Sequence, residues 1–197
     1  CAAPSRLFRL RVLSVELDLP HRGRVTRLGL RRGVTLIVGG GYHGKSTLLK
    51  ALQEGRVQPC GGDGRELVIT DATAMKLRAE DGRVVQGVDI SPFISNLPNG
   101  RDTRVFSTED ASGSTSQAAS TIDAEAGVRA LLIDEDTSAT NFMVRDALME
   151  QSWRRIMNHH ALRGARESCG KRQGVSSVIV VGSSGGVRSR SPDCVVQ

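Results

Sequence analysis

The sequence predicts an α/β fold, with a mainly parallel sheet flanked by helices and a small antiparallel β appendage. Two observations predict this fold. Short, almost continuously apolar runs recur at residues 34–38, 130–133 and 175–181, as expected for strands buried on both faces. Stretches with helical character separate the runs, and such alternation is typical of parallel sheets. With 197 residues, the chain is long enough for one domain with a substantial core.

Other segments add detail to this fold. Residues 8–17 and 25–30 alternate apolar and polar side chains around His21-Arg22-Gly23, which predicts two antiparallel strands. Glu80-Asp81-Gly82 predicts a hairpin turn between residues 74–79 and 83–88, and residues 67–70 suggest a strand. Residues 91–110 are expected to be irregular. We divide the single domain as follows: 1–33 N-terminal strands, 34–150 core, 151–174 basic helical insertion, 175–197 final core strands.

A glycine-rich segment lies between the first apolar run and a helical pattern. It reads Gly39-Gly40-Gly41-Tyr42-His43-Gly44-Lys45-Ser46, followed by Thr47. Backbone N–H groups can converge there on phosphates, so the segment predicts a phosphate-binding loop rather than an ordinary glycine-rich turn. Lys45 would reach the β- and γ-phosphates of ATP, and the Ser46 hydroxyl would bind Mg²⁺.

Two carboxylates follow the apolar run at residues 130–133. Asp134 and Glu135 are expected at the carboxyl end of a buried strand, which in a parallel sheet borders the phosphate-binding loop. Asp134 would then hold Mg²⁺, and Glu135 would orient or deprotonate the attacking water. The alternative is an acidic pair entering a surface loop, but the nearby phosphate-binding loop favours the catalytic interpretation.

Ser112, Gly113 and Ser114 begin a helical stretch that ends near Gly127. A serine at this place can simply cap the helix. Small residues at a helix N-terminus can also present N–H groups, a hydroxyl and the helix dipole to a phosphate. Ser112 lies 22 residues before Asp134, with one helix and one strand between them.

This spacing resembles that of the signature motif and the acidic strand in ABC-class ATPases. The sequence is most similar to one branch, the predicted ABC-class ATPases of bacteria and kinetoplastids, which includes the kinetoplastid mitochondrial ATPase associated with RNA editing. Here Ala111-Ser-Gly-Ser-Thr115 replaces the usual Leu-Ser-Gly-Gly-Gln. The resemblance covers residues 28–150 strongly and 175–197 weakly, through the motifs Gly62-Asp-Gly-Arg65, Arg78-Ala-Glu-Asp-Gly82, Val88-Asp-Ile-Ser-Pro-Phe-Ile94, Phe106-Ser-Thr108, 111–117 and 132–143.

The resemblance implies a P-loop NTPase of the ABC class that binds ATP and Mg²⁺ and hydrolyses ATP. It also implies a head-to-tail homodimer, in which Ser112, Gly113 and Ser114 of one protomer contact ATP held by Lys45 and Ser46 of the other. The loop after the acidic strand, with Ser138 and Asn141, would lie at the dimer interface.

Two features depart from the family pattern. The class usually carries a histidine after the last strand, where this chain has Ser183, so we assign the catalytic position to Ser183 and expect slow hydrolysis. The glutamine-bearing loop of the class is not evident, and Gln86, Asp89 and Asn96 remain open candidates.

Positive charge is concentrated in the flanks of the chain. Residues 1–33 carry eight Arg and two acidic residues, whereas residues 34–150 carry 11 basic and 17 acidic residues. If residues 151–174 are helical, Arg155, Arg163 and Arg166 share a face that could follow an RNA backbone, although a solvated helix face is the alternative. With the resemblance, this predicts action on RNA or a ribonucleoprotein in mitochondrial RNA processing. The rival functions are a transporter's nucleotide-binding subunit and a slow nucleotide-dependent assembly switch.

No apolar run approaches the roughly 18 residues needed to span a bilayer, so we expect no membrane insertion. No targeting segment is visible, and the compartment follows from the resemblance alone: mitochondrial, or cytoplasmic if the kinetoplastid link fails. The four cysteines are scattered, which favours neither a zinc site nor a disulfide framework. Because the chain begins at Cys1 rather than Met, we expect it to be a fragment of a longer protein.

Overall fold

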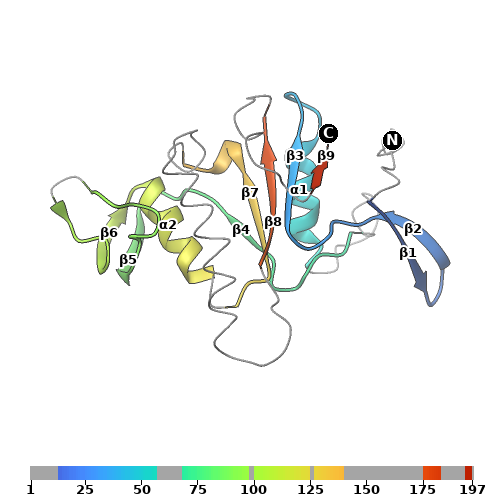
Figure 1. Cartoon of the computed structure of the whole chain (residues 1–197), viewed down its shortest axis with the longest axis horizontal. Helices are drawn as coiled ribbons and strands as arrows, with labels where there is room; N and C mark the ends of the chain where they lie inside the picture. Colours follow the sequence, from blue (N-terminus) through green and yellow to red (C-terminus); the bar gives the residue numbers. More distant parts are fainter. Residues whose placement is uncertain are drawn as a thin grey trace.

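The computed structural model describes residues 13–56, 68–97, 100–124, 127–139, 175–182 and 194–196. A five-stranded sheet with the order β4-β7-β8-β3-β9 forms its centre (Figure 1). All neighbouring strands in this sheet are parallel. The strands are β3 (Val34–Val38), β4 (Met75–Leu77), β7 (Ala130–Asp134), β8 (Ser176–Val181) and β9 (Cys194–Val196).

Two helices cover opposite faces of the sheet: α1 (Lys45–Glu54) and α2 (Gly113–Ala124). Ile37 and Leu132 belong to the same apolar cluster as Leu49 of α1. Their sequence neighbours Leu36 and Leu131 belong to the cluster on the other face, which includes Ala124 of α2. Because both faces are covered, successive strand residues are apolar. The predicted α/β fold is confirmed.

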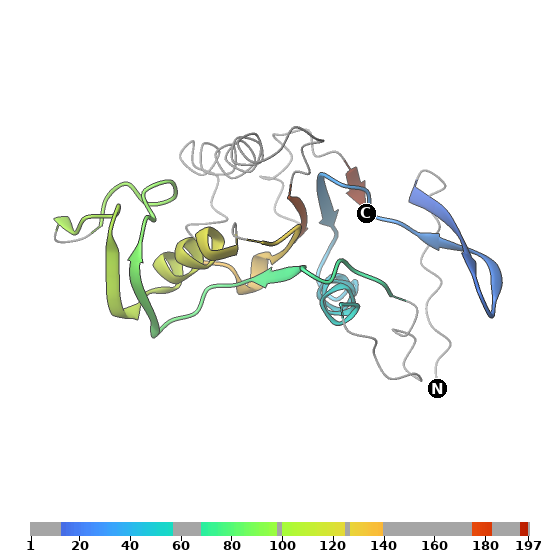
Figure 2. The ribbon, with the colours of Figure 1, turned by 90° about the horizontal axis from the view of Figure 1, so that it is seen from below.

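An antiparallel ribbon projects from one end of the molecule (Figures 1 and 2). It consists of β1 (Ser14–Leu19) and β2 (Gly23–Leu28), joined by a short turn in which Gly23 has a φ of 62°. Opposite residues pair in register from Ser14 with Leu28 to Leu19 with Gly23. This ribbon confirms the predicted antiparallel appendage.

A second antiparallel pair lies at the opposite end (Figure 2) and was not predicted. It consists of β5 (Arg83–Val88) and β6 (Phe106–Ala111), which pack with α2 around Val85 and Phe106. Residues 106–110 were expected to be irregular, and that expectation is wrong.

The predicted hairpin between residues 74–79 and 83–88 is also wrong. Met75–Leu77 pairs with β7 in the parallel sheet, and β5 pairs with β6 instead. The reason lies in the connection: the N–H of Ala79 donates to the Thr137 carbonyl at 2.9 Å, and that of Gly82 donates to the Ala111 carbonyl at 2.9 Å. The turn therefore leads from one sheet to the other. Residues 68–70 are not a strand either.

A turn before β4 joins the amino end of β7. Asp71 Oδ1 accepts hydrogen bonds from the Thr73 hydroxyl at 2.6 Å and the Thr73 N–H at 2.9 Å. The Thr73 hydroxyl oxygen in turn accepts from the Arg129 N–H at 2.9 Å, and Asp71 lies 3.4 Å from the Arg129 guanidinium. These hydrogen bonds, and less strongly the Arg129 charge, lower the pKa of Asp71 below its ordinary value.

Within the described part of the chain, no helix is both long enough and apolar enough to cross a membrane.

Candidate nucleotide-binding site

The glycine-rich loop connects the carboxyl end of β3 with the first residue of α1. Gly44 precedes the helix in the left-handed conformation, with a φ of 79°, which glycine adopts without steric cost. Tyr42 has a φ of 62°, an uncommon conformation for a residue with a side chain, and its ring is fully exposed. Residues 41–44 are all exposed. The loop is therefore accessible to a ligand from solvent.

The Lys45 side chain folds back over the loop. Its ammonium group donates to the Gly39 carbonyl at 2.8 Å and to the Gly40 carbonyl at 2.5 Å. A Cβ atom at Gly40 would lie only 3.2 Å from the His43 ring, which explains the absence of a side chain there. Ser46 and Thr47 follow in the first turn of α1 and are exposed. The loop thus combines the positive charge of Lys45, the hydroxyls of Ser46 and Thr47 and the N-terminus of a helix.

The two predicted carboxylates have different environments at the end of β7. Asp134 is buried, with 3% of its surface exposed, and accepts a hydrogen bond from the Asp136 N–H at 3.4 Å. Glu135 is half-buried, and its Oε2 accepts a hydrogen bond from the Gly182 N–H directly after β8. A Cβ at Gly182 would lie 3.1 Å from this oxygen. Glycine therefore permits the carboxylate to approach the backbone.

The loop and the acidic pair lie at the same edge of the sheet because β3, β7 and β8 are parallel. β8 separates β3 from β7, so the two parts are two strand spacings apart, or about 10 Å. A chain of phosphate groups with a cation and a water molecule can occupy such a gap.

Ser112 is exposed and immediately precedes α2, which begins at Gly113. The Ser112 hydroxyl lies 3.1 Å from the Thr115 hydroxyl, which donates to the Ser112 carbonyl at 3.0 Å. The Gly113 N–H donates to Asp81 Oδ1 at 2.6 Å. The beginning of α2 is therefore held by a carboxylate from the connection between β4 and β5.

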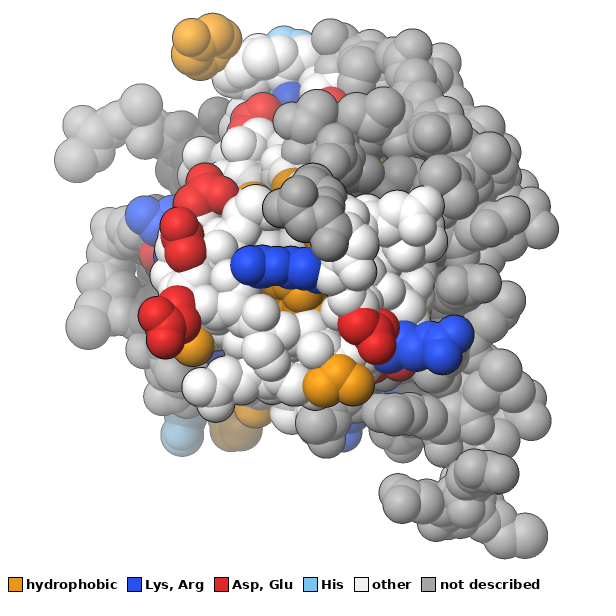
Figure 3. Space-filling view, turned by 90° about the vertical axis from the view of Figure 1, so that its left-hand side faces the viewer, with side chains coloured by type: hydrophobic (Ala, Val, Ile, Leu, Met, Phe, Trp, Pro, Cys, Tyr) orange, Lys and Arg blue, Asp and Glu red, His pale blue; other side chains and the backbone are white. Residues whose placement is uncertain are grey.

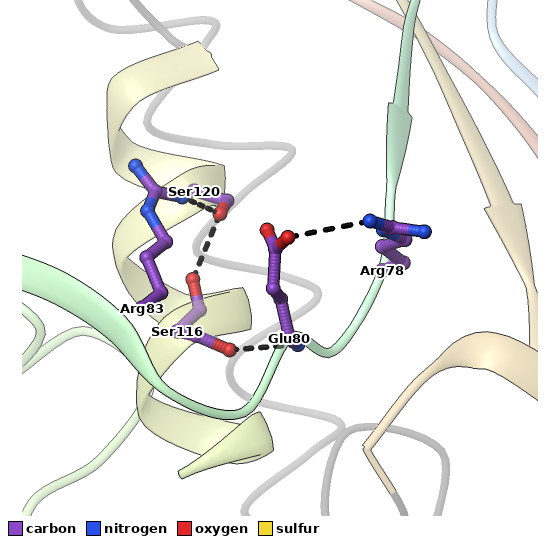
Figure 4. A network of polar contacts seen from close by, with 5 residues as sticks. All are labelled: Arg78, Glu80, Arg83, Ser116 and Ser120. Carbon is purple, nitrogen blue, oxygen red and sulfur yellow. Dashed lines mark hydrogen bonds and ion pairs between the residues drawn. The ribbon is translucent and has the colours of Figure 1, made fainter. Parts of the chain in front are cut away.

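Residues 78–83, here called the clamp segment, bind α2 at several points (Figure 4). The Glu80 N–H donates to the Ser116 hydroxyl at 3.0 Å, and the Glu80 carboxylate lies 3.3 Å from Arg78. Arg83 donates to the Ser120 hydroxyl and also pairs with Asp123 at 2.7 Å. Together with the Ala79 bond to Thr137, these contacts join α2 to the loop after the acidic strand.

The comparison with known protein families agrees with this arrangement. The family model for the ABC_ATPase P-loop domain matches residues 10–197, nearly the whole chain. The chain belongs to the ABC ATPase family. An uncharacterized protein of Methanocaldococcus jannaschii is similar to this ABC ATPase, with 36% identity over 140 residues. That similarity covers 68% of this chain and 30% of the archaeal protein, so the chain spans less than a third of that relative.

Several residues predicted to serve this ABC ATPase lie outside the described residues. They are Ser183, Asn141, Arg155, Arg163 and Arg166, and their assignments stay predictions. Ser138, the other predicted residue of the dimer loop, is described. Its hydroxyl donates to the Asp134 carbonyl at 2.8 Å, and its N–H donates to the Glu135 carbonyl at 3.3 Å. This loop is therefore tied to the acidic pair.

The structure also reveals contacts that the sequence did not indicate. Gly182 contributes only a backbone N–H to Glu135, and a backbone group leaves no motif. Gln86 and Asp89, open candidates for the glutamine-bearing loop, lie in or directly after β5 and not at the edge of the parallel sheet. The residues that follow β4 at that edge are Arg78, Ala79 and Glu80. Gln117, in the second turn of α2, closes the motif at residues 111–117, but its role was not evident from the sequence.

Proposed function

We propose that this ABC ATPase binds ATP with Mg²⁺ at residues 39–47 and hydrolyses it with the help of Glu135. The observation that carries the proposal is the shared sheet edge, where the loop and the acidic pair are about 10 Å apart. Lys45 would exchange the Gly39 and Gly40 carbonyls for phosphate oxygens. Glu135, held by the Gly182 N–H, would orient or deprotonate the attacking water.

The residues present suit Mg²⁺. Among the described residues, no group of three or more His, Cys, Asp or Glu side chains could hold a metal ion with protein ligands alone. Mg²⁺ commonly uses one or two carboxylates together with phosphate oxygens, so the Asp134 carboxylate and the Ser46 hydroxyl are an appropriate protein contribution. When bound, the ion would neutralise charge on the phosphates.

We further propose a head-to-tail homodimer. The beginning of α2 is tied to the clamp segment, which follows β4, whereas the phosphate-binding loop follows β3 on the other side of β7 and β8. Both ribbon views show α2 on the β4 side of the sheet (Figures 1 and 2). Ser112, Gly113 and Ser114 are therefore poorly placed for the loop of their own chain. A second copy would bring them to it.

The test uses Glu135→Gln, which keeps the shape of the side chain but removes the base. With ATP and Mg²⁺, we expect this variant to accumulate as a dimer in size-exclusion chromatography, while its ATP hydrolysis falls on the order of 100-fold. Asp136→Asn, a change to the exposed neighbour, is the matched control and should turn over ATP like the wild type. A Glu135→Gln protein that stays monomeric with ATP would contradict the dimer.

RNA or a ribonucleoprotein is the proposed target, in mitochondrial RNA processing and within the mitochondrion. Among the described residues, support comes from the region of the β1–β2 ribbon, where Arg22, Arg31 and Arg32 are exposed. Arg24 is also exposed but already lies 3.5 Å from Asp18. The face at the β5–β6 end instead mixes acidic with basic side chains (Figure 3). The ribbon end is therefore the better candidate for phosphate contacts.

Measurements of ATP hydrolysis with and without RNA test whether RNA is the target. ATP hydrolysis by the wild-type chain should rise with added RNA, and the stimulation should fall steeply with salt. A slow nucleotide-dependent assembly switch is the second candidate, favoured by Ser183 at the usual histidine position. It predicts an ATP-dependent dimer with no stimulation by RNA and no RNA mobility shift at low salt.

A further inference from the structure

Gln117 is a buried polar residue in the second turn of α2 that the proposed mechanism leaves unused. Only 1% of its surface is exposed, and its helix neighbours Ala118 and Ala119 are fully buried. Burying an amide is costly unless its polar atoms are hydrogen-bonded. If this position served only to fill the core, an apolar residue would be sufficient. The hydrogen-bond partners of the Gln117 amide therefore indicate its role.

Both ends of the Gln117 amide bind the loop after the acidic strand. Its Nε2 group donates to the Ser138 hydroxyl at 3.2 Å, and its Oε1 accepts from the Ala139 N–H at 2.7 Å. The Ser138 hydroxyl in turn donates a hydrogen bond to the Asp134 carbonyl at 2.8 Å. A continuous hydrogen-bonded path thus runs from α2 to the peptide group that joins Asp134 to Glu135.

The same helix begins with the residues proposed to contact the partner's ATP. Gly113 and Gln117 are one helical turn apart, a rise of about 6 Å. The clamp segment holds the first turns of α2 through Asp81 and Glu80. A displacement of the helix N-terminus is therefore expected to move Gln117 and the loop that it holds.

We infer that Gln117 is a positioning residue that couples the two ATP sites of the dimer, an inference that rests on the proposed function. In such a dimer, α2 of one protomer contacts ATP in the partner, while Glu135 of the same protomer serves its own ATP. Gln117 connects these two elements within one chain. Binding of the partner's phosphate at Ser112–Ser114 is thereby transmitted to the loop that orients Glu135.

The test compares Gln117→Met, which conserves side-chain length but removes both hydrogen bonds, with Thr121→Val. Thr121 is equally buried one turn later, and within the described part of the chain its hydroxyl donates to the Gln117 carbonyl of the same helix, at 2.8 Å. The rate of ATP hydrolysis is measured against ATP concentration, and each variant's melting temperature is recorded. For Gln117→Met we expect kcat to fall by about 10-fold to 100-fold, the range typical of residues that orient catalytic groups, with KM changed by less than about 3-fold.

The Hill coefficient is the readout that a structural role would not move. It should lie above 1 for the wild type and for Thr121→Val, and fall to about 1 for Gln117→Met. In the combined Gln117→Met/Ser138→Ala variant, the loss should be close to the larger single loss, because both changes break one path.

Three results would overturn the inference. The first is a Gln117→Met enzyme with wild-type kcat and cooperativity. The second is a Thr121→Val enzyme that loses as much as Gln117→Met, which would trace the effect to helix stability. The third is a combined variant whose fold-loss in kcat equals the product of the two single fold-losses, which would mean that the two residues act independently. A wild-type chain that neither dimerises with ATP nor hydrolyses it would instead refute the proposed function, and the coupling with it.

Discussion

The phosphate-binding loop and the beginning of α2 are two regions proposed to meet the same ligand, yet they are built differently. The loop is exposed at residues 41–44, and Lys45 binds carbonyl groups of the loop itself. The beginning of α2 is bound to the clamp segment, because the Gly113 N–H donates to Asp81. One turn later, Gln117 accepts from the Ala139 N–H and so binds the loop after the acidic strand. The phosphate-binding loop thus supplies positive charge from an exposed region. The beginning of α2 is instead held in one position by hydrogen bonds to other segments.

This difference predicts two kinds of failure. A substitution in the loop removes a charge or hydroxyl that few other groups depend on, so chemistry should be lost while the fold survives. A substitution at the beginning of α2 disturbs contacts among three segments, so it should change how protomers fit together. Turnover, thermal melting and ATP-dependent dimerisation, measured on matched variants, separate these two outcomes.

The largest effect is expected for Lys45→Ala. It removes the positive charge of the loop, so ATP hydrolysis should fall by about 100-fold or more, in line with the loss of one electrostatic stabiliser of a transition state. The melting temperature should hardly change, because the partners of the ammonium group among the described residues are two carbonyls of the loop itself, at Gly39 and Gly40. Turnover and thermal melting are measured together.

Lys50→Ala is the matched control for that change. Lys50 is an exposed lysine of the same helix, 4.0 Å from Glu54, and such surface pairs contribute little. It should keep wild-type turnover. Equal losses in the two variants would mean that the helix surface, rather than the phosphate-binding loop, determines the rate.

An intermediate effect is expected for Gly113→Ala. A Cβ at this position would lie 3.1 Å from the Ala79 Cβ and 3.4 Å from Asp81 Oδ1, so the clamp segment must shift. Overpacking of this kind costs about 1–3 kcal/mol. If part of that cost falls on the dimer, ATP-dependent dimerisation should weaken by about tenfold. Binding of ATP to the monomer should be unchanged.

Sedimentation with ATP and Mg²⁺ measures the dimer, and a fluorescent ATP analogue measures binding to the monomer. Gly127→Ala is the control, since no atom of the described residues lies within 4 Å of a Cβ added there. Weaker ATP binding by monomeric Gly113→Ala would show that the two regions are not separate.

The smallest effect is expected for Asp71→Asn, which lies in neither region and gives a baseline for both. The folded-state pKa of Asp71 is lowered by its hydrogen bonds to Thr73. Its charged form therefore stabilises the fold above the pKa of the unfolded chain, and this contribution is lost as the pH falls through the folded-state pKa. Asp71→Asn should reduce stability at neutral pH by about 1 kcal/mol or less, and should flatten the loss of stability below about pH 4.

Urea unfolding at neutral and acidic pH measures this effect. ATP hydrolysis should stay at the wild-type rate. An Asp71→Asn protein that is as sensitive to acid as the wild type would show that another carboxylate dominates that pH range.

The sequence predicted those features that depend on neighbouring residues. The strands β3, β7 and β8, the helix α1 and the phosphate-binding loop all follow from short patterns, such as the spacing of Gly39, Gly44 and Lys45. The position of Asp134 at the carboxyl end of β7 follows in the same way, because an apolar run ends there.

Other features depend on partners that are remote in the sequence. Glu80-Asp81-Gly82 has the composition of a hairpin turn, but Met75–Leu77 finds a better partner in residues 131–133 of β7. Gln117 resembles any polar helix residue until the fold places the loop of Ser138 beside it. A local pattern contains no information on such pairings.

The place of β8 in the sheet has a consequence for synthesis of the protein. This strand lies between β3 and β7, yet it comes after both in the chain, at Ser176–Val181. While a ribosome is still making residues 140–170, β3 and β7 have no strand to join them, and each exposes unpaired backbone groups. The proposed nucleotide site can therefore assemble only when most of the domain has emerged, and we expect incomplete chains to bind no ATP and to aggregate more readily.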